Sequence, residues 1–442
     1  MVDRALIGRV AFGLYVACVL AAIVVAYPEL ASRSPGPSPS ARRATPPPRT
    51  AVGPGVPVAA LGRATSQFRG DETHRGVGPT PVSTALRVSW EVKPGNVGIH
   101  GASKGSPAVD DTGVYVGTDA GVLQRISHDG KIVWKFKVGH AVNGIHGTPL
   151  LDQALVYVGA YNGELYGLDK ENGAPRWSVK LGDAIGASPV PWGDDLLVAV
   201  EVALPGDGYV ARVRRATGEV IWRSGWLGEQ AHSSVTIDEA SGTALVGANN
   251  ATYTGLGLDD GALSFRFLAD GPVKDTGCLV NGTVFFTTRV GTLFALDARS
   301  GEVRFRTHLA NVTRSSPSHA PDGTTLVVAA STIRAHEGRL AYLYGVDTRS
   351  GEVRWQRSTG TDDSAASALV ARDPTGTWNA WIRCGDDALC AFDTETGAQR
   401  ARVVVGGKLT GVPVGHQGSL YLSLDAPGGV IRLSPTSPAV AP

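Results

Sequence analysis

The sequence has little charge and almost no excess of one sign. Its 442 residues include 41 Lys and Arg against 40 Asp and Glu, which gives a formal net charge of +1. This balance excludes a general basic field of the kind that binds nucleic acid, so we expect no nucleic-acid partner. Charged residues make up 18% of the chain and hydrophobic residues 43%. A charged, disordered polymer is therefore excluded too, and a large core can form.

Cysteine and methionine are also scarce. The chain has four cysteines, none in a Cys-x-x-Cys pair, and one methionine. Four cysteines are too few for a scaffold built on disulfides, and their spacing does not suggest a zinc site. Glycine is abundant instead, with 57 residues, about twice its average share. This composition favours turn-rich β-structure over a helix bundle.

One apolar run stands near the N-terminus. Residues 10–27 contain no charge, and as a helix they would be about 27 Å long, enough to cross the core of a bilayer. We predict a transmembrane signal-anchor, with residues 1–9 as a short cytoplasmic tail. A cleaved signal peptide is the alternative, although no clean Ala-x-Ala site follows. A lipid-modified Cys18 is a weaker interpretation, because Tyr15 stands where Leu is usual and the apolar run continues beyond the cysteine.

A linker rich in Pro, Ser and Arg follows at residues 28–63. It cannot bury a core, and its prolines keep the chain extended. We expect a spacer that holds a folded domain, residues 64–434, away from the membrane. With the tail in the cytoplasm, that domain would be extracytoplasmic, in the periplasm. Residues 435–442 are expected to form a disordered tail.

The folded part of the chain is one unit repeated. Segments such as 156–177, 284–305 and 343–355 share the same order of apolar, turn and aromatic residues. An aromatic residue or its substitute ends each unit, at Trp90, Trp134, Trp177, Trp222, Phe265, Phe305, Trp355 and Ala401. The spacing of these eight residues averages about 44, which suits a four-stranded propeller blade.

A Ser-Pro-like element precedes the first strand of each unit and gives a count of eight. It begins at Ser106, Thr148, Ser188, Ser233, Thr276, Ser316, Ser367 and Val412. The last unit lacks an outer strand, while residues 85–93 form an outer strand without a preceding blade. We therefore predict an all-β, eight-bladed propeller of four-stranded blades in which the N-terminal strand completes the last blade, so that no sheet edge is left open.

Aspartates mark the turn before four of the outer strands, and each is followed by glycine four residues later: Asp169, Asp297, Asp347 and Asp393. A carboxylate there can accept backbone N–H bonds, while glycine supplies a positive φ. The aromatic residue that follows can wedge between blades. We interpret these aspartates and aromatic residues as parts of the fold and not as catalysts.

The pattern [AG]-x-D-x-x-x-G-x-x-x-[WF] occurs at residues 167–177, 295–305 and 345–355. It resembles the tryptophan-docking repeat of the PQQ-like, quinoprotein-type β-propeller family. Residues 68–76, which begin FRGD, resemble the segment before the first blade in noncatalytic members. The resemblance implies an eight-bladed propeller. It leaves two branches open: quinone-dependent dehydrogenases, and BamB-like scaffolds of outer-membrane β-barrel assembly.

The cysteines favour the noncatalytic BamB-like branch. The resemblance implies that a dehydrogenase has a vicinal cysteine pair, a tryptophan floor, a calcium ion and a catalytic aspartate, whereas Cys278, Cys384 and Cys390 are not adjacent. We expect no enzyme activity, no cofactor and no metal, and we interpret Asp275 near Cys278 as a turn carboxylate beside a buried thiol. Cys384 and Cys390 flank a hairpin tip. A two-residue loop would put them on opposite faces and a longer loop would allow a disulfide, so the pairing stays open.

The loops that lead into the inner strands converge on the propeller axis, and cations prevail among them. The aligned positions are Lys104, His146, Gly186, His232, Lys274, Arg314, the pair Asp362 and Asp363, and Lys408. Like charges around a concave mouth would attract a carboxylate or an acidic peptide of a partner. The alternative is a solvated rim balanced by nearby aspartates. We expect a monomeric propeller that binds envelope proteins, with a PQQ-dependent dehydrogenase and a ligand-sensing domain as alternative functions.

Overall fold

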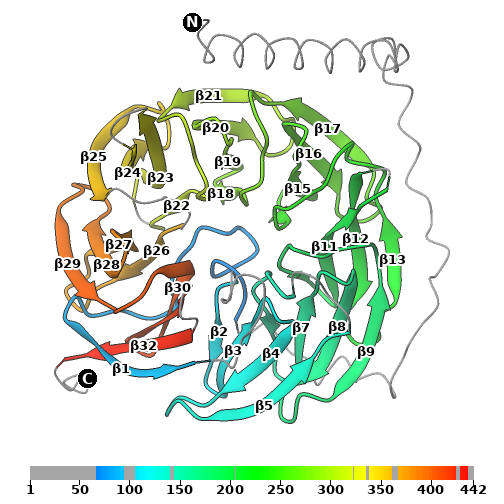
Figure 1. The fold of residues 1–442 in the computed structure, drawn as a ribbon. Helices are drawn as coiled ribbons and strands as arrows, with labels where there is room; N and C mark the ends of the chain where they lie inside the picture. The colour runs from blue at the N-terminus through cyan, green and yellow to red at the C-terminus, as the bar shows by residue number, and fades with distance from the viewer. Residues whose placement is uncertain are drawn as a thin grey trace, which may run out of the picture. The chain divides into compact units, whose positions relative to one another are not determined.

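The computed structural model describes residues 66–93, 105–139, 144–204, 206–321, 323–334, 338–360, 367–424 and 429–436. All regular elements in these residues are β-strands, grouped in eight four-stranded sheets. Figure 1 shows the sheets arranged as blades around one axis. The predicted all-β, eight-bladed propeller is confirmed.

Each blade runs from a short inner strand at the axis to an outer strand at the rim. Blades 1 and 2 consist of β2 (Ala108–Asp110), β3 (Gly113–Gly117), β4 (Val122–Ile126), β5 (Ile132–Lys137), β6 (Leu150–Leu151), β7 (Leu155–Gly159), β8 (Glu164–Asp169) and β9 (Pro175–Lys180). Blades 3 and 4 consist of β10 (Val190–Trp192), β11 (Asp195–Val202), β12 (Asp207–Arg214), β13 (Val220–Arg223), β14 (Thr236–Asp238), β15 (Thr243–Gly247), β16 (Thr252–Gly257) and β17 (Leu263–Leu268).

The second half of the ring repeats this order. Blades 5 and 6 consist of β18 (Cys278–Val280), β19 (Thr283–Thr287), β20 (Thr292–Asp297), β21 (Val303–His308), β22 (Ser318–His319), β23 (Thr325–Arg334), β24 (Gly338–Asp347) and β25 (Val353–Gly360). Blade 7 consists of β26 (Leu369–Arg372), β27 (Trp378–Cys384), β28 (Ala388–Asp393) and β29 (Gln399–Val404). Blade 8 consists of β30 (Leu409–His416), β31 (Ser419–Leu424), β32 (Gly429–Pro435) and β1 (Leu86–Val92).

Blade 8 closes the ring with the two ends of the domain. Strand β1 pairs antiparallel with β32, in a register that joins Leu86 to Pro435 and Val92 to Val430. Figure 1 shows the blue β1 alongside the red β32. The N-terminal strand is thus the outer strand of the last blade, as the sequence predicts, and β32 extends one residue beyond the predicted boundary at residue 434.

The middle strands of the blades form the core because each blade packs between two others. Every residue of the middle strand β7 is buried. No residue of the outer strand β17 is buried, and its side chains are either half-buried or exposed. A strand that is buried on both faces has a continuous apolar run in its sequence, which explains the segment LVYVG of β7.

The repeated aromatic residues lie between neighbouring blades. Trp177 of blade 2 donates its indole N–H to the Arg215 carbonyl of blade 3 at 2.9 Å, and its ring covers Gly218, where an added Cβ would meet it at 2.6 Å. Gly218 has a φ of 72°, so glycine is required for its backbone as well as for its lack of a side chain. The same contact recurs in the pairs Trp90–Gly130, Trp134–Gly173, Trp222–Gly261, Phe265–Gly301, Phe305–Gly351 and Trp355–Gly397.

The turn aspartates each hold a tight turn. The Asp169 carboxylate accepts the backbone N–H groups of Glu171 and Asn172. Asp297, Asp347 and Asp393 accept the equivalent pairs of N–H groups. In blade 3, where Arg214 replaces aspartate, the turn keeps its main-chain bond from Gly218 N to Arg214 O at 2.9 Å. The Arg214 guanidinium lies 3.1 Å from Asp195 instead.

Cys384 and Cys390 form a disulfide in blade 7, with their Cα atoms 5.7 Å apart. The hairpin between β27 and β28 pairs Cys384 with Ala388, so its loop has three residues and not two. The longer loop brings both cysteines to one face, which decides the question that the sequence left open.

Several sequence predictions concern residues outside those that the structure describes. They are the cytoplasmic tail 1–9, the apolar run 10–27, the linker 28–63 and most of the C-terminal tail. Among the residues that are described, none belongs to a helix long and apolar enough to cross a membrane.

Candidate functional site

A ring of hydroxyl groups surrounds the propeller axis where the inner strands begin. We call it the hydroxyl belt: Ser106, Thr148, Ser188, Ser234, Thr276, Ser316 and Ser367. The Thr148 N–H donates to Ser188 Oγ at 2.9 Å, and the Ser188 N–H donates to Ser234 Oγ at 3.0 Å. The same link joins blades 4 to 5, 5 to 6, 6 to 7 and 8 to 1. The repeated Ser-Pro-like element therefore ties neighbouring blades together at six of the eight boundaries.

The structure shifts the sequence alignment by one residue in blade 4. The belt hydroxyl there is Ser234, whereas Ser233 bonds within its own blade to the backbone N–H of Gly247 at 2.8 Å. At blade 8 the equivalent residue is Val412, which has no hydroxyl but donates its N–H to Ser106 Oγ at 2.7 Å.

The segment before the first blade crosses the channel below the belt. We call residues 66–78 the plug; Figure 1 shows this blue segment inside the ring. Its backbone carbonyls at Glu72, Thr73 and Arg75 accept N–H groups from the inner strands of blades 4, 5 and 6, while Ser66 pairs with Leu151 of blade 2. At its other end Gly76 and Gly78 bond Val370 of blade 7. The plug thus closes the channel and bonds blades on every side of it.

Two buried side chains fix the plug. Arg69 donates to the His74 carbonyl at 3.1 Å and to Ser318 Oγ at 2.9 Å, and burial lowers its pKa to about 10. The His74 ring is fully buried, with Nε2 at 2.9 Å from the Val235 carbonyl of blade 4. Burial, reinforced by the charge of Arg69, lowers the pKa of His74 to about 4. His74 is therefore neutral at pH 7.

Above the plug lies a cavity of about 190 Å³ on the axis, which we call the axial cavity. Four of the predicted axial residues line it: His146, His232, Lys274 and Arg314. Phe68 of the plug also lines it, from below. Gly186, another predicted position, also lines the cavity. Lys408 is exposed and is not part of the lining. The remaining predicted positions lie outside the described residues: Lys104, Asp362 and Asp363.

Both cavity histidines are backed by carboxylates that sequence reasoning missed. His146 Nε2 lies 2.8 Å from Asp119, and His232 Nδ1 lies 3.1 Å from Glu201; the two carboxylate side chains are only 1% and 5% exposed. The ring of Tyr161 packs against His146 with centroids 4.5 Å apart. These partners come from the turns and strands of neighbouring blades, so no spacing along the chain could reveal them.

Asp275 is the one aspartate among the described residues that line the axial cavity. Burial raises its pKa above the usual range, although Arg289, Arg69 and Arg314 oppose the shift. Cys278 is also buried, and burial raises the pKa of its thiol to about 12. This thiol is therefore unreactive near neutral pH.

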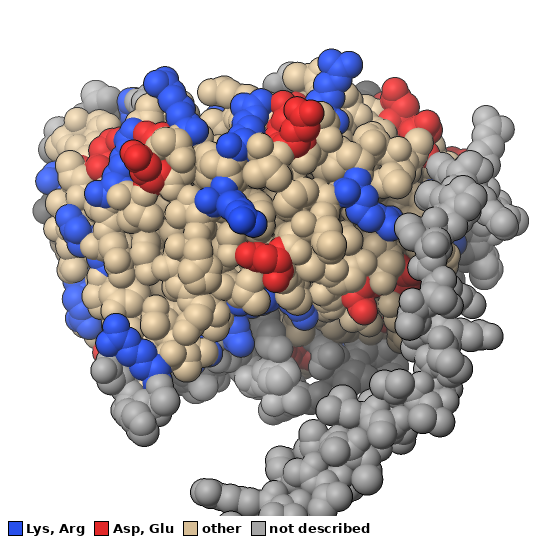
Figure 2. All heavy atoms as spheres, turned by 90° about the horizontal axis from the view of Figure 1, so that it is seen from above, with Lys and Arg blue, Asp and Glu red and all other residues tan. Residues whose placement is uncertain are grey.

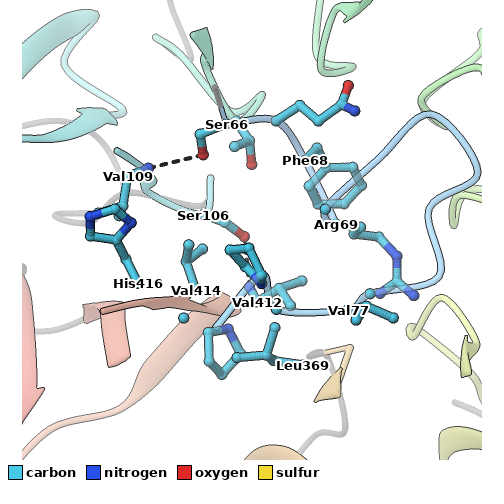
Figure 3. Close-up of a pocket in the computed structure, with 18 residues that line it drawn as sticks. Ser66, Phe68, Arg69, Val77, Ser106, Val109, Leu369, Val412, Val414 and His416 are labelled. Carbon is cyan, nitrogen blue, oxygen red and sulfur yellow. Dashed lines mark hydrogen bonds between the residues drawn. The ribbon is translucent and has the colours of Figure 1, made fainter. Parts of the chain in front are cut away.

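A second cavity of about 120 Å³ lies between the plug and blades 8 and 1. Figure 3 shows its lining, with Phe68 and Arg69 of the plug opposite Val412, Val414 and His416 of blade 8. The Ser66 hydroxyl holds the plug to this rim by accepting the Val109 N–H at 3.1 Å. Its lining is mainly apolar, and Phe68, Ser106, Thr148 and Val412 border both this cavity and the axial cavity.

The residues of the axial cavity do not fit a calcium-bound quinone. Its described lining includes no cysteine pair and no tryptophan. The described residues also contain no cluster of three or more His, Cys, Asp or Glu side chains placed to hold a metal ion. No step of a quinone reaction is therefore assigned to these residues.

The side of the ring shows no field of one sign. Figure 2 shows Lys and Arg interspersed with Asp and Glu over one flank of the propeller. Three outer-strand arginines pair with the turn aspartates of their own blades, as Arg176 does with Asp169 at 2.6 Å. Mixed charge of this kind suits a soluble flank and not a nucleic-acid surface.

Comparison with known proteins points to one family. Residues 84–201 and 206–441 match the family described as "Outer membrane protein assembly factor BamB". The protein of that name from Salmonella typhimurium is 26% identical over 283 residues, which cover 59% of this chain and 71% of the relative. The one from Escherichia coli is 25% identical over 228 residues, or 47% of this chain and 57% of that protein. The match thus spans less than two thirds of the E. coli relative.

Solved structures share the fold with both branches of the family. BamB from Moraxella catarrhalis superimposes with a TM-score of 0.59 at 16% identity, over 80% of this chain and 99% of that one. Quinohemoprotein alcohol dehydrogenase from Comamonas testosteroni superimposes with a TM-score of 0.69 at 14% identity, over 87% and 83% of the two chains. At these identities the likeness concerns the fold alone.

Proposed function

The chain belongs to the family described as "Outer membrane protein assembly factor BamB", and from that premise we propose that it is a noncatalytic scaffold for the assembly of outer-membrane proteins. The relatives of that name support the process. The observation that carries the scaffold role is the plug, because a channel closed from below leaves a broad loop surface above and no passage through the ring.

We propose that partners dock on the upper face, which carries the loops that lead into the inner strands and the hairpins between the second and third strands. Three large apolar side chains are exposed there over blades 3 and 4: Leu204 at 89%, Trp226 at 47% and Leu268 at 73%. Arg266 donates to the Trp226 carbonyl at 2.9 Å, which ties the loop between β13 and β14 to the outer strand β17 of blade 4. Exposed apolar groups beside polar loops are typical of protein interfaces.

The disulfide supports an extracytoplasmic location. Disulfides persist in oxidising compartments such as the periplasm and are rare in the cytosol, and Cys384–Cys390 closes a hairpin in the core of blade 7. We propose that residues 10–27 anchor the chain in the membrane and that residues 28–63 hold a monomeric propeller away from it.

Deletion of the gene in its native host tests the proposed process. We expect the amount of folded β-barrel protein in the outer membrane to fall, and a gene copy encoding the wild-type chain to restore it. A copy with Leu204→Asp and Leu268→Asp should restore much less. Leu263→Asp is the matched control, because Leu263 is also exposed on β17 but at its lower end. Normal levels of barrel protein in the deletion strain would contradict the proposal.

Incubation of the purified propeller with pyrroloquinoline quinone and calcium tests the noncatalytic part of the proposal. We expect no reduction of an electron-accepting dye on addition of alcohols or aldose sugars. Dye reduction that requires both quinone and calcium would instead establish the dehydrogenase.

A further inference from the structure

We infer that the axial cavity is a binding site for a carboxylate group. The cavity lies where the hydroxyl belt, two cationic loops and two carboxylate-backed histidines converge above the plug. Its occupant is either a small free carboxylate or the carboxylate of a partner's peptide, and the second source rests on the scaffold function proposed above.

The belt supplies hydrogen-bond donors that have no acceptor among the described residues. Ser188, Ser234, Thr276 and Ser316 line the cavity, and the oxygen of each accepts a backbone N–H from the preceding blade. A hydroxyl that accepts in this way keeps its own hydrogen for donation. Within the described part of the chain, none of these four hydroxyls donates to a protein acceptor. Four O–H groups therefore remain for a ligand on the axis.

Two cationic side chains, Lys274 and Arg314, lie on one side of the cavity. Lys274 and Arg314 lead into the adjacent blades 5 and 6 and line the cavity with Asp275 between them in the chain. Within the described lining, the two cations outnumber the one carboxylate, Asp275, by one. Such an excess matches one carboxylate better than a phosphate dianion.

His146 lines the cavity across the axis from one of the two cations. His146 leads into blade 2, which faces blade 6 across the axis of an eight-membered ring. Asp119 and Glu201 lie within ion-pair distance of the two imidazoles but are not among the lining residues of the cavity. In the described lining, a cationic ligand would therefore meet one carboxylate, Asp275, beside two cations. The hydroxyl donors of the belt and the two cations favour an anion.

The size and depth of the cavity limit what enters it. About 190 Å³ accommodates a small acid or one terminal residue of a peptide, but not a folded domain. Phe68 lies beneath and shields the site from solvent on that side. Charges and hydrogen bonds act more strongly when water is excluded.

Calorimetric titration of the purified propeller with three probes tests the inference: succinate, a pentapeptide with a free C-terminal carboxylate, and the same pentapeptide as its C-terminal amide. We expect succinate or the free-acid peptide to bind and the amide to bind at least tenfold more weakly than the free acid. The probe that binds more tightly identifies the source of the carboxylate.

Lys274→Gln with Arg314→Gln should weaken binding of the better probe at least tenfold. Lys135→Gln, an exposed cation on the outer strand β5, is the matched control and should bind as the wild type does. Melting temperature reports folding, and single Lys274→Gln serves if the double variant is unstable. Absence of binding by both carboxylates, equal binding of the amide, or unchanged affinity in the Lys274 variant would overturn the inference.

The same double variant separates this inference from the proposed scaffold function. If it loses carboxylate binding but restores barrel proteins in the deletion strain, the site serves a free carboxylate and partner docking lies elsewhere on the upper face. If the wild type binds no carboxylate while the deletion strain loses its barrel proteins, the inference fails and the scaffold function stands.

Discussion

The boundary between blades 2 and 3 and the boundary between blades 7 and 8 are built from different parts. At the first, Trp177 is 2% exposed and docks on Gly218, and the belt links Thr148 to Ser188. At the second, Ala401 replaces the aromatic residue and Val412 replaces the belt hydroxyl. Both devices of the repeat are therefore missing where blade 7 meets blade 8.

Residues outside the repeat pattern replace them. The apolar cluster between blades 7 and 8 contains Trp381, which is fully buried, together with Val82 and Leu86 from the N-terminal segment. The N-terminal segment also bonds blade 7 directly, because the Val82 N–H donates to the Arg372 carbonyl at 2.7 Å. This boundary depends on distant chain segments, whereas the boundary of blades 2 and 3 depends on neighbours in sequence.

The difference teaches that the repeat and the closure are separate sources of stability. A docked aromatic residue stabilises any pair of consecutive blades, but the last pair needs the N-terminal segment to complete its packing. Mutations in the two regions should therefore have distinguishable effects.

Removal of the N-terminal segment should have the largest effect. Deletion of residues 1–93 removes the plug and β1, so it leaves an open edge at β32 and an incomplete core between blades 7 and 8. We expect loss of cooperative folding, whereas deletion of residues 1–57 should leave the melting temperature unchanged. Thermal unfolding followed by circular dichroism compares the two. Equal melting temperatures would show that the closure adds nothing to the repeat.

Replacement of one buried tryptophan at each boundary comes next. Trp177→Ala and Trp381→Ala should each cost about 3–5 kcal/mol, because each deletes a large buried ring. Chemical denaturation gives the two free energies of unfolding. A nearly neutral Trp381→Ala would mean that Trp381 does not take the place of the docked aromatic residue.

Acid should loosen the plug through His74. Its pKa is about 4 in the folded protein against an ordinary value of 6.5, so the unfolded chain takes up the proton first as pH falls. The stabilisation is complete above about pH 6.5 and is lost as pH falls toward 4, a change of about 3 kcal/mol. His74→Gln should be less stable at pH 7 but should lack this part of the pH dependence. Identical slopes of stability against pH in both proteins would contradict the assignment.

The belt should give the smallest effect. Ser188→Ala leaves the buried Thr148 N–H without its acceptor, which should cost about 1–2 kcal/mol. Val412→Thr offers a hydroxyl at the one position of the belt that lacks it and should change stability by less than about 1 kcal/mol. If Ser188→Ala proves neutral, the belt orders the axis without stabilising the ring.

The fold could be predicted from the sequence because its causes are repeated. Eight copies of one pattern reveal eight blades, and the unmatched strands at the two ends reveal the closure. The plug could not be predicted in the same way. Its backbone carbonyls bond inner strands of blades 4 to 7, and such contacts have no period and no residue type of their own.

The axial cavity was predicted only in part for a similar reason. The loops that lead into the inner strands align with one another, so His146, His232, Lys274 and Arg314 could be found together. Asp119, Tyr161 and Glu201 belong to other turns and strands, and only the packing of neighbouring blades brings them behind the histidines. The belt had a visible repeat, but its alignment was wrong by one residue in blade 4, where two serines follow each other.

The pairing of β1 with β32 also sets the order of events during folding. Contacts within a blade join residues close in sequence and can form early, but Leu86 meets Pro435 only after nearly the whole domain has been synthesised. Pairing over such a separation carries a loop-closure entropy and is slow compared with local hairpins. Until then β32 presents an unpaired edge that can recruit a strand from another chain. The step most exposed to aggregation is thus the last one, and a chaperone that shielded β32 would raise the yield of closed propellers.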